Sequence, residues 1–202
     1  RPRWIAIESW SPRLFLFAGL FLFIGASMSG IALLIEARSF NRWVGLTLEF
    51  GRLAALIGTA GLSFQISRQH PRLGQLSRGV AILAAVFTIG LILSAALTAA
   101  GFLSSAPTAV GLSTYILSVS TFLLYGVVII RTGSYPTSIG LLLLVNVAAL
   151  LVVFFGRLAL PLGLLATVVP GFQALLYSSI GYRLRLGSVP TQRTTPLIEK
   201  SP

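Results

Sequence analysis

A glutamate and an arginine stand three residues apart inside one of the long apolar runs of the chain, at Glu49 and Arg52. In a helix this spacing places both side chains on one face, where they can form an ion pair. Ionisable groups at membrane depth are costly, so the pair is either a structural clasp or part of a binding or permeation site. Glu36, at the end of the preceding apolar run, is a candidate third member from the same side.

Two amides, Asn146 and Gln173, also lie inside apolar runs. Amides in membrane helices usually form a hydrogen bond with a neighbouring helix, which is worth about 0.6 to 2 kcal/mol. We therefore expect them to join helices. The lining of a polar path through the bundle is the alternative.

The remaining polar residues exclude most catalytic chemistry. The chain has no cysteine and no aspartate, one histidine (His70), and four glutamates that are far apart in the sequence. This composition excludes thiolate metal sites, a bis-histidine haem and paired aspartates within the chain. No lysine lies in an apolar run, which excludes a retinal Schiff base. We expect a protein that is not an enzyme and that carries no metal and no cofactor.

Composition places the chain in a membrane. Of its 202 residues 55% are hydrophobic and 9% are charged, whereas about a quarter of the residues in soluble domains are charged. A membrane-spanning helix needs about 20 mostly apolar residues. Six runs have about this length, so we predict an all-α, polytopic transmembrane bundle of six helices, with spans at residues 14–35, 44–66, 80–103, 109–130, 139–155 and 158–182.

These spans divide the chain into an N-terminal interfacial segment (1–12), a six-helix transmembrane domain (13–186) and a disordered cytoplasmic tail (187–202). The junction between the fifth and sixth spans is the least marked. An alternative is one long, bent segment, but about 44 helical residues would run about 66 Å, twice the thickness of a hydrocarbon core.

The arginines predict the orientation. Basic residues near span ends are retained in the cytoplasm. With six spans, three basic residues fall on one face (Arg38, Arg42 and Arg157), and eleven of the 15 fall on the other: Arg1, Arg3, Arg13, Arg68, Arg72, Arg78, Arg131, Arg183, Arg185, Arg193 and Lys200. We therefore expect both termini in the cytoplasm. The same distribution along membrane-flanking segments argues against nucleic-acid binding.

Three stretches resemble small six-span membrane proteins of halophilic archaea. They are residues 51–58 leading into 69–73, Leu124-Tyr125-Gly126 ahead of residues 131–133, and residues 173–177 continuing to Gly181-Tyr182. The resemblance covers residues 50–185 and implies an archaeal host and a plasma-membrane location. It carries no functional residue, because the family is functionally uncharacterised.

Two functions of different classes follow from these features. The first is a structural or accessory subunit that packs against another membrane protein or a second copy, with lipids around it. The second is a small solute or ion transporter or channel that uses the Glu49/Arg52 pair. Binding of a lipid or pigment between the spans is a further alternative.

Overall fold

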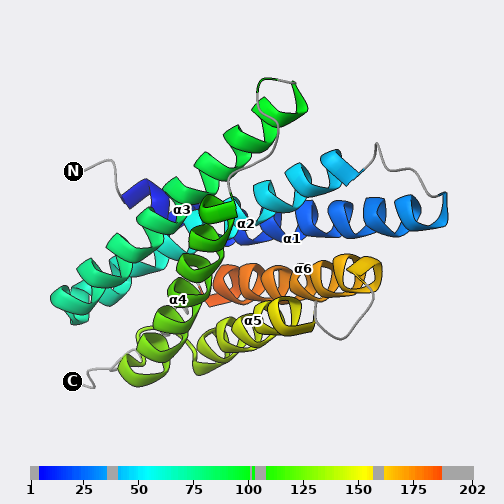
Figure 1. Cartoon of the computed structure of the whole chain (residues 1–202). Helices are drawn as coiled ribbons and strands as arrows, with labels where there is room; N and C mark the ends of the chain where they lie inside the picture. The colour runs from blue at the N-terminus through cyan, green and yellow to red at the C-terminus, as the bar shows by residue number, and fades with distance from the viewer. Residues whose placement is uncertain (1–4, 36–40, 101, 103–107, 157–161, 188–202) are drawn as a thin grey trace, which may run out of the picture.

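The computed structural model describes residues 5–35, 41–100, 102, 108–156 and 162–187. In these ranges the chain is all-α and contains no strand (Figure 1). Its six helices are α1 (Ile5–Leu34), α2 (Asn41–Gln69), α3 (Pro71–Ala99), α4 (Thr108–Thr132), α5 (Thr137–Gly156) and α6 (Leu162–Gly187). The fifth and sixth apolar runs therefore form two helices, and the residues that link them, including Arg157, lie outside the described ranges.

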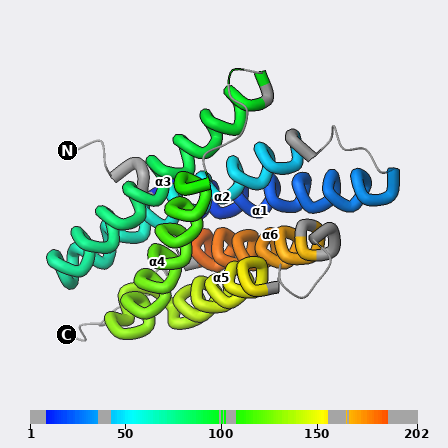
Figure 2. The backbone as a smooth tube through the Cα atoms, in the orientation of Figure 1, coloured from blue at the N-terminus to red at the C-terminus, as the bar shows by residue number. Residues whose placement is uncertain are grey.

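Successive helices run in opposite directions along the bundle, so the start of α1 and the end of α6 lie on the same side (Figure 2). Each helix packs against its neighbours in the sequence, and α6 also packs against α1. In addition, α2 contacts α4. The six helices thus form a closed ring in which α2 touches α1, α3 and α4.

The connection between α2 and α3 is a single residue, His70. Proline disfavours helical geometry in the residue before it and is well placed in the first turn of a helix. His70 accordingly has φ −134° and ψ 82°, and α3 begins at Pro71 rather than at Val80, where the apolar run starts. The first and last helices also extend beyond the predicted spans. α1 begins at Ile5, within the expected interfacial segment, and α6 continues to Gly187.

The turn between α4 and α5 is fixed onto the end of α2. Gly133 adopts φ 63°, a left-handed conformation that glycine reaches without strain, and its N–H donates to the Ile129 carbonyl at 3.0 Å. The buried Ser134 then donates its hydroxyl to Oε1 of Gln69 at 2.7 Å. This bond joins two turns that lie at the same end of the bundle.

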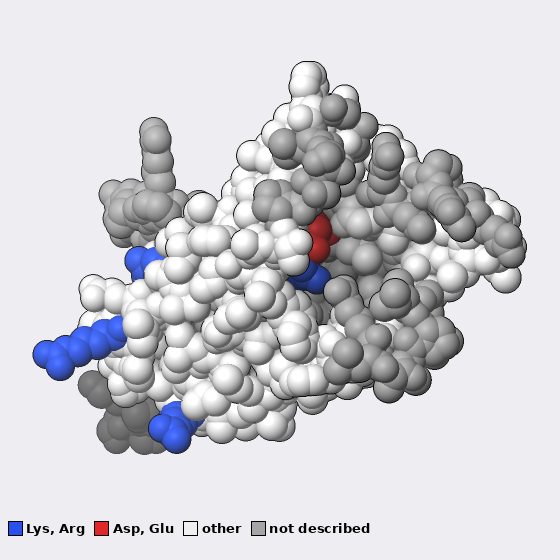
Figure 3. All heavy atoms as spheres, in the orientation of Figure 1, with Lys and Arg blue, Asp and Glu red and all other residues white. Residues whose placement is uncertain are grey.

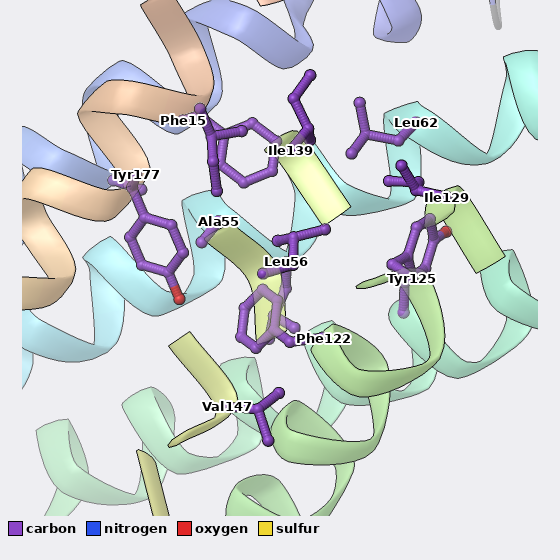
Figure 4. Close-up of a cluster of buried hydrophobic side chains, with 14 of the residues drawn as sticks. Phe15, Ala55, Leu56, Leu62, Phe122, Tyr125, Ile129, Ile139, Val147 and Tyr177 are labelled. Atoms are coloured by element: carbon purple, nitrogen blue, oxygen red, sulfur yellow. The ribbon is translucent and has the colours of Figure 1, made fainter. Parts of the chain in front are cut away.

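The core fills the centre of the ring (Figure 4). Phe15 from α1, Leu56 from α2, Phe122 from α4 and Tyr177 from α6 are almost fully buried there. Tyr177 lies between two aromatic rings, with centroids 6.0 Å from that of Phe15 and 5.9 Å from that of Phe122. Side chains from four helices therefore meet around one tyrosine.

The outer surface is apolar as well. Four helices, namely α1, α3, α4 and α5, contain stretches that are long and apolar enough to cross a membrane. A soluble protein rarely exposes a large continuous apolar patch, whereas α3 exposes Ile82, Leu83, Val86, Ile89, Leu93 and Leu97. These features mark the chain as a helical membrane protein. Glu49 and Arg52 lower the hydropathy of α2, which is not among the four.

Glycines allow the helix backbones to approach closely. A Cβ atom built on Gly140 of α5 would lie 2.9 Å from the carbonyl oxygen of Gly126 on α4. Small residues at such crossings are the usual means of packing helices in a membrane. A Cβ built on Gly90 of α3, by contrast, meets no atom within 4 Å.

We therefore expect Gly140→Ala to lower stability by about 1 to 3 kcal/mol, because α4 and α5 must move apart. The measurement is the thermal unfolding of the detergent-purified protein. Gly90→Ala is the matched control and should leave stability unchanged or raise it by up to about 1 kcal/mol. Equal effects of the two substitutions would show that the close crossing does not limit packing.

Candidate functional site

Glu49 and Arg52 form the one ion pair within the described ranges. Nη1 of Arg52 donates to both carboxylate oxygens, at 2.8 Å to Oε1 and 3.0 Å to Oε2. The Arg52 side chain is 24% exposed and the Glu49 side chain 18%. Figure 3 shows acidic atoms directly beside basic atoms, with other basic atoms towards one end of the molecule. The pair is therefore accessible but set apart from the basic end of the bundle.

The pair lies within a single helix. Its hydrogen bonds connect α2 only to itself, and no described residue of another helix bonds to either charged group. A pair of this kind stabilises a helix by about 0.2 to 0.5 kcal/mol. Its hydrogen bonds therefore do not hold two helices together, and whether the pair is a structural clasp or a site stays a prediction.

Arg52 lies deep along its helix. It is eleven residues from Asn41, the first residue of α2, which corresponds to about 16 Å at 1.5 Å per residue. An extended arginine side chain can carry its charged group towards the membrane surface, but it covers only part of this distance. The charge thus lies further from the helix end than the apolar pattern alone indicates, because α2 begins before the apolar run.

The two amides belong to one hydrogen-bond network between α5 and α6. Nε2 of Gln173 donates to Oδ1 of Asn146 at 2.9 Å, and Nδ2 of Asn146 donates to the Tyr177 hydroxyl at 2.9 Å. All three side chains are buried. The helix-joining role expected for amides in membrane helices is the one that Asn146 and Gln173 have here.

Tyr177 connects this network to the ion pair. Its hydroxyl points towards the interior of the bundle (Figure 4) and interacts electrostatically with Arg52. The candidate residues Arg52, Asn146 and Gln173, from three helices, are therefore brought together around a tyrosine that the sequence did not single out. The spacing of Gln173 and Tyr177, four residues apart on one helical face, was the available signal.

Other candidate positions do not join this cluster in the described ranges. Glu36 lies outside them, so its position relative to Glu49 stays a prediction. His70 is exposed at the α2–α3 turn. Among the residues that are described, no three histidine, aspartate or glutamate side chains approach one another closely enough to hold a metal ion.

Three basic residues lie elsewhere than expected. The apolar pattern puts Arg68, Arg72 and Arg78 in a loop, whereas Arg68 belongs to α2 and the other two belong to α3. Of the three, Arg78 is half-buried against α2. Hydropathy cannot identify such a contact, because the partners of Arg78 are small hydroxyl residues.

Comparisons with protein-family models, curated proteins and solved structures give no match for this chain.

A double-mutant cycle tests the network between α5 and α6. Asn146→Leu leaves the Tyr177 hydroxyl without its donor, and Tyr177→Phe removes the hydroxyl. Because both changes delete the same bond, we expect unfolding free energies that are not additive, with a coupling of about 0.6 to 2 kcal/mol. Glu49→Gln, measured in the same way, should cost less than about 0.5 kcal/mol. Additive effects at 146 and 177 would contradict the network.

Proposed function

We propose that all six helices cross the cell membrane and that both termini lie in the cytoplasm. The alternating directions of the helices support this topology, as does the gathering of basic side chains at one end in Figure 3. The helices α2 and α6 contain 29 and 26 residues, long enough to cross a hydrocarbon core of about 30 Å. The charges on α2 are paired with each other and only partly exposed, so they do not prevent this helix from crossing the membrane.

We further propose that the protein is a small transporter or channel for a polar solute or ion, with Arg52 as the residue that contacts it. The observation that carries this proposal is the position of a helix-internal ion pair at depth, which costs free energy and joins no two helices. A charged pair that costs free energy at this depth and joins no helices is best explained by a role in binding a ligand. The solute would be an anion or carry a strong hydrogen-bond acceptor.

The free donors of Arg52 support this assignment. Only Nη1 is used by Glu49, so Nε and Nη2 bond to none of the described residues. The guanidinium group presents five N–H donors in all. Glu49 balances the charge of Arg52 while the site is empty, which lowers the cost of the arginine at this depth.

The surroundings of the pair support access from one side. Glu49 and Arg52 are partly exposed, whereas Leu56, one turn further along α2, is fully buried. Phe122 of α4 is also fully buried, in the same core cluster as Leu56 (Figure 4). These apolar side chains would close the path below the site. Movement of α4 or α5 relative to α2 would be needed to open it.

A role as an accessory subunit is the second candidate, and one observation favours it. The stretch of α3 that can cross a membrane is only 17% buried, the lowest share of the four such helices. Its exposed face offers Leu and Ile side chains from Ile82 to Leu97. Another membrane protein or a second copy could pack there, although lipid chains would cover the same face equally well.

Single cysteines test the six-span topology, because the chain contains none of its own. In intact cells we expect an impermeant maleimide to label Phe102→Cys but not Trp10→Cys, His70→Cys or Thr137→Cys. The last three should react only after permeabilisation, since six spans put them on the cytoplasmic side. If only the four most apolar helices crossed, Trp10→Cys and His70→Cys would lie on opposite sides, and this result would refute the topology.

Accessibility and flux together test the role of Arg52. In liposomes of known orientation, Glu49→Cys and Arg52→Cys should react with a charged thiosulfonate from one side only. Leu56→Cys on the same helix is the buried control and should not react. Flux of acetate, chloride and inorganic phosphate is then measured, and Arg52→Gln should lower the flux of the transported probe about 10- to 100-fold, the loss of a charged hydrogen bond. Unreactive cysteines at both positions, or full flux of the probe through Arg52→Gln, would refute the proposal.

A further inference from the structure

A second polar cluster lies at the other end of α2, around Arg78 of α3. Nε of Arg78 donates to the Ser63 hydroxyl at 3.1 Å, and Nη2 donates to the Ser67 hydroxyl at 3.4 Å. The guanidinium carbon lies 4.2 Å from the centre of the Phe64 ring. All three partners belong to α2, so Arg78 is directed into the α2–α3 contact rather than into solvent.

The positive charge of Arg78 has no carboxylate partner in the described ranges. Glu49 is the one acidic side chain whose surroundings are described, and it is bonded to Arg52. The serine hydroxyls are neutral, and the cation–π contact with Phe64 offsets only part of the desolvation cost. A half-buried cation without a counter-charge favours an anion beside it.

Tyr125 of α4 supplies a second, independent observation. Its side chain is fully buried, and its hydroxyl makes no hydrogen bond of good geometry in the structure. The hydroxyl lies beside Ser63, Ser77 and Arg78, and Figure 4 shows it directed away from Phe122. Buried tyrosine hydroxyls are nearly always bonded. The phenol proton therefore points into the cluster without an acceptor that is well placed to receive it.

The nearby serines offer the phenol only neutral hydroxyl oxygens, and neither forms a hydrogen bond of good geometry with it. Ser63 donates its proton to a backbone carbonyl of its own helix at 2.6 Å, and Ser77 does the same at 2.7 Å. The Ser63 oxygen also receives the bond from Arg78. No described residue places a negatively charged acceptor between the Tyr125 hydroxyl and the N–H groups of Arg78 that the serines leave unused.

We propose that Arg78 and Tyr125 bind a small inorganic anion, of the charge and size of chloride, between α2, α3 and α4. An anion accepts hydrogen bonds from both residues and compensates the charge of Arg78. The size limit follows from the complete burial of Tyr125 and from the side chains of Ser63 and Ser77 around its hydroxyl. Arg72 and Arg131, exposed at the same end, raise the local concentration of anions.

This site is separate from the one at Arg52 and does not depend on transport. Ser63 is eleven residues from Arg52 along α2, which corresponds to about 16 Å. Buried Leu56 and Leu62 lie on α2 between the two sites. An anion at Arg78 would hold α2, α3 and α4 together even if Arg52 bound nothing.

The test uses bromide as the probe on the whole purified protein. Unfolding temperatures are measured in sodium bromide and in sodium gluconate at equal ionic strength. With bromide at about ten times its Kd we expect the wild-type Tm to rise by about 3 to 6 °C. Tyr125→Phe and Arg78→Gln should lose this rise. Tyr182→Phe and Arg183→Gln, which change exposed residues near the same end, should keep it.

Crystals of the wild-type protein grown in bromide give a readout that does not depend on any variant. We expect an anomalous difference peak within hydrogen-bonding distance of the Tyr125 hydroxyl and the Arg78 guanidinium. A water molecule there without anomalous signal, together with equal bromide effects in Tyr125→Phe and wild type, would overturn the proposal. Stabilisation by phosphatidylglycerol nanodiscs over phosphatidylcholine ones, lost in Arg78→Gln and with no bromide effect, would overturn it in favour of a lipid phosphate.

Discussion

The arrangement of this bundle depends on the contacts of one side chain, Tyr177. From α6 its ring packs against Phe15 of α1 and Phe122 of α4, and its hydroxyl accepts a bond from Asn146 of α5. The same hydroxyl interacts with Arg52 of α2. Four of the six helices therefore meet at one residue, and a fifth, α2, is coupled to it electrostatically. In a membrane, where the apolar surroundings drive helices together only weakly, such a polar and aromatic centre specifies which helices are neighbours.

The polar groups of the chain divide into two kinds by what they connect. Asn146, Gln173 and Tyr177 satisfy one another across a helix interface and so contribute to packing. Arg52 and Arg78 keep donors that no described residue uses. Arg52 belongs to α2, and Arg78 of α3 packs against it. α2, one of the two helices that contact three others, is thus also the helix around which the charges of the bundle gather.

Much of the helical architecture is predictable from hydropathy, because helices alone satisfy their own backbone in an apolar medium. The residues at which the helices begin and end are harder to predict. The basic residues before Val80 suggested a loop, yet α3 begins at Pro71, since a helix continues past the apolar core wherever its backbone can remain bonded. The separate α5 and α6 agree with the interpretation that one continuous helix would be too long.

The candidate site is predictable in part. Glu49, Arg52, Asn146 and Gln173 stand out because such residues are rare in apolar runs. Tyr177 does not, because tyrosine is common at membrane surfaces and its depth depends on packing. The environment of Arg78 is also hidden, since its partners are serines and the face of a phenylalanine, which carry no charge pattern.

The one-residue connection at His70 has a consequence for how the protein enters the membrane. A linker so short cannot let α2 and α3 move separately, and the approach of Gly74 to Ser67 keeps their backbones in contact. The charges of α2 make it a poor insertion signal by itself, whereas α3 is among the most apolar helices of the chain. If both helices cross the membrane, as proposed, they would enter it together as a hairpin, in which the apolar α3 favours insertion of its more polar neighbour.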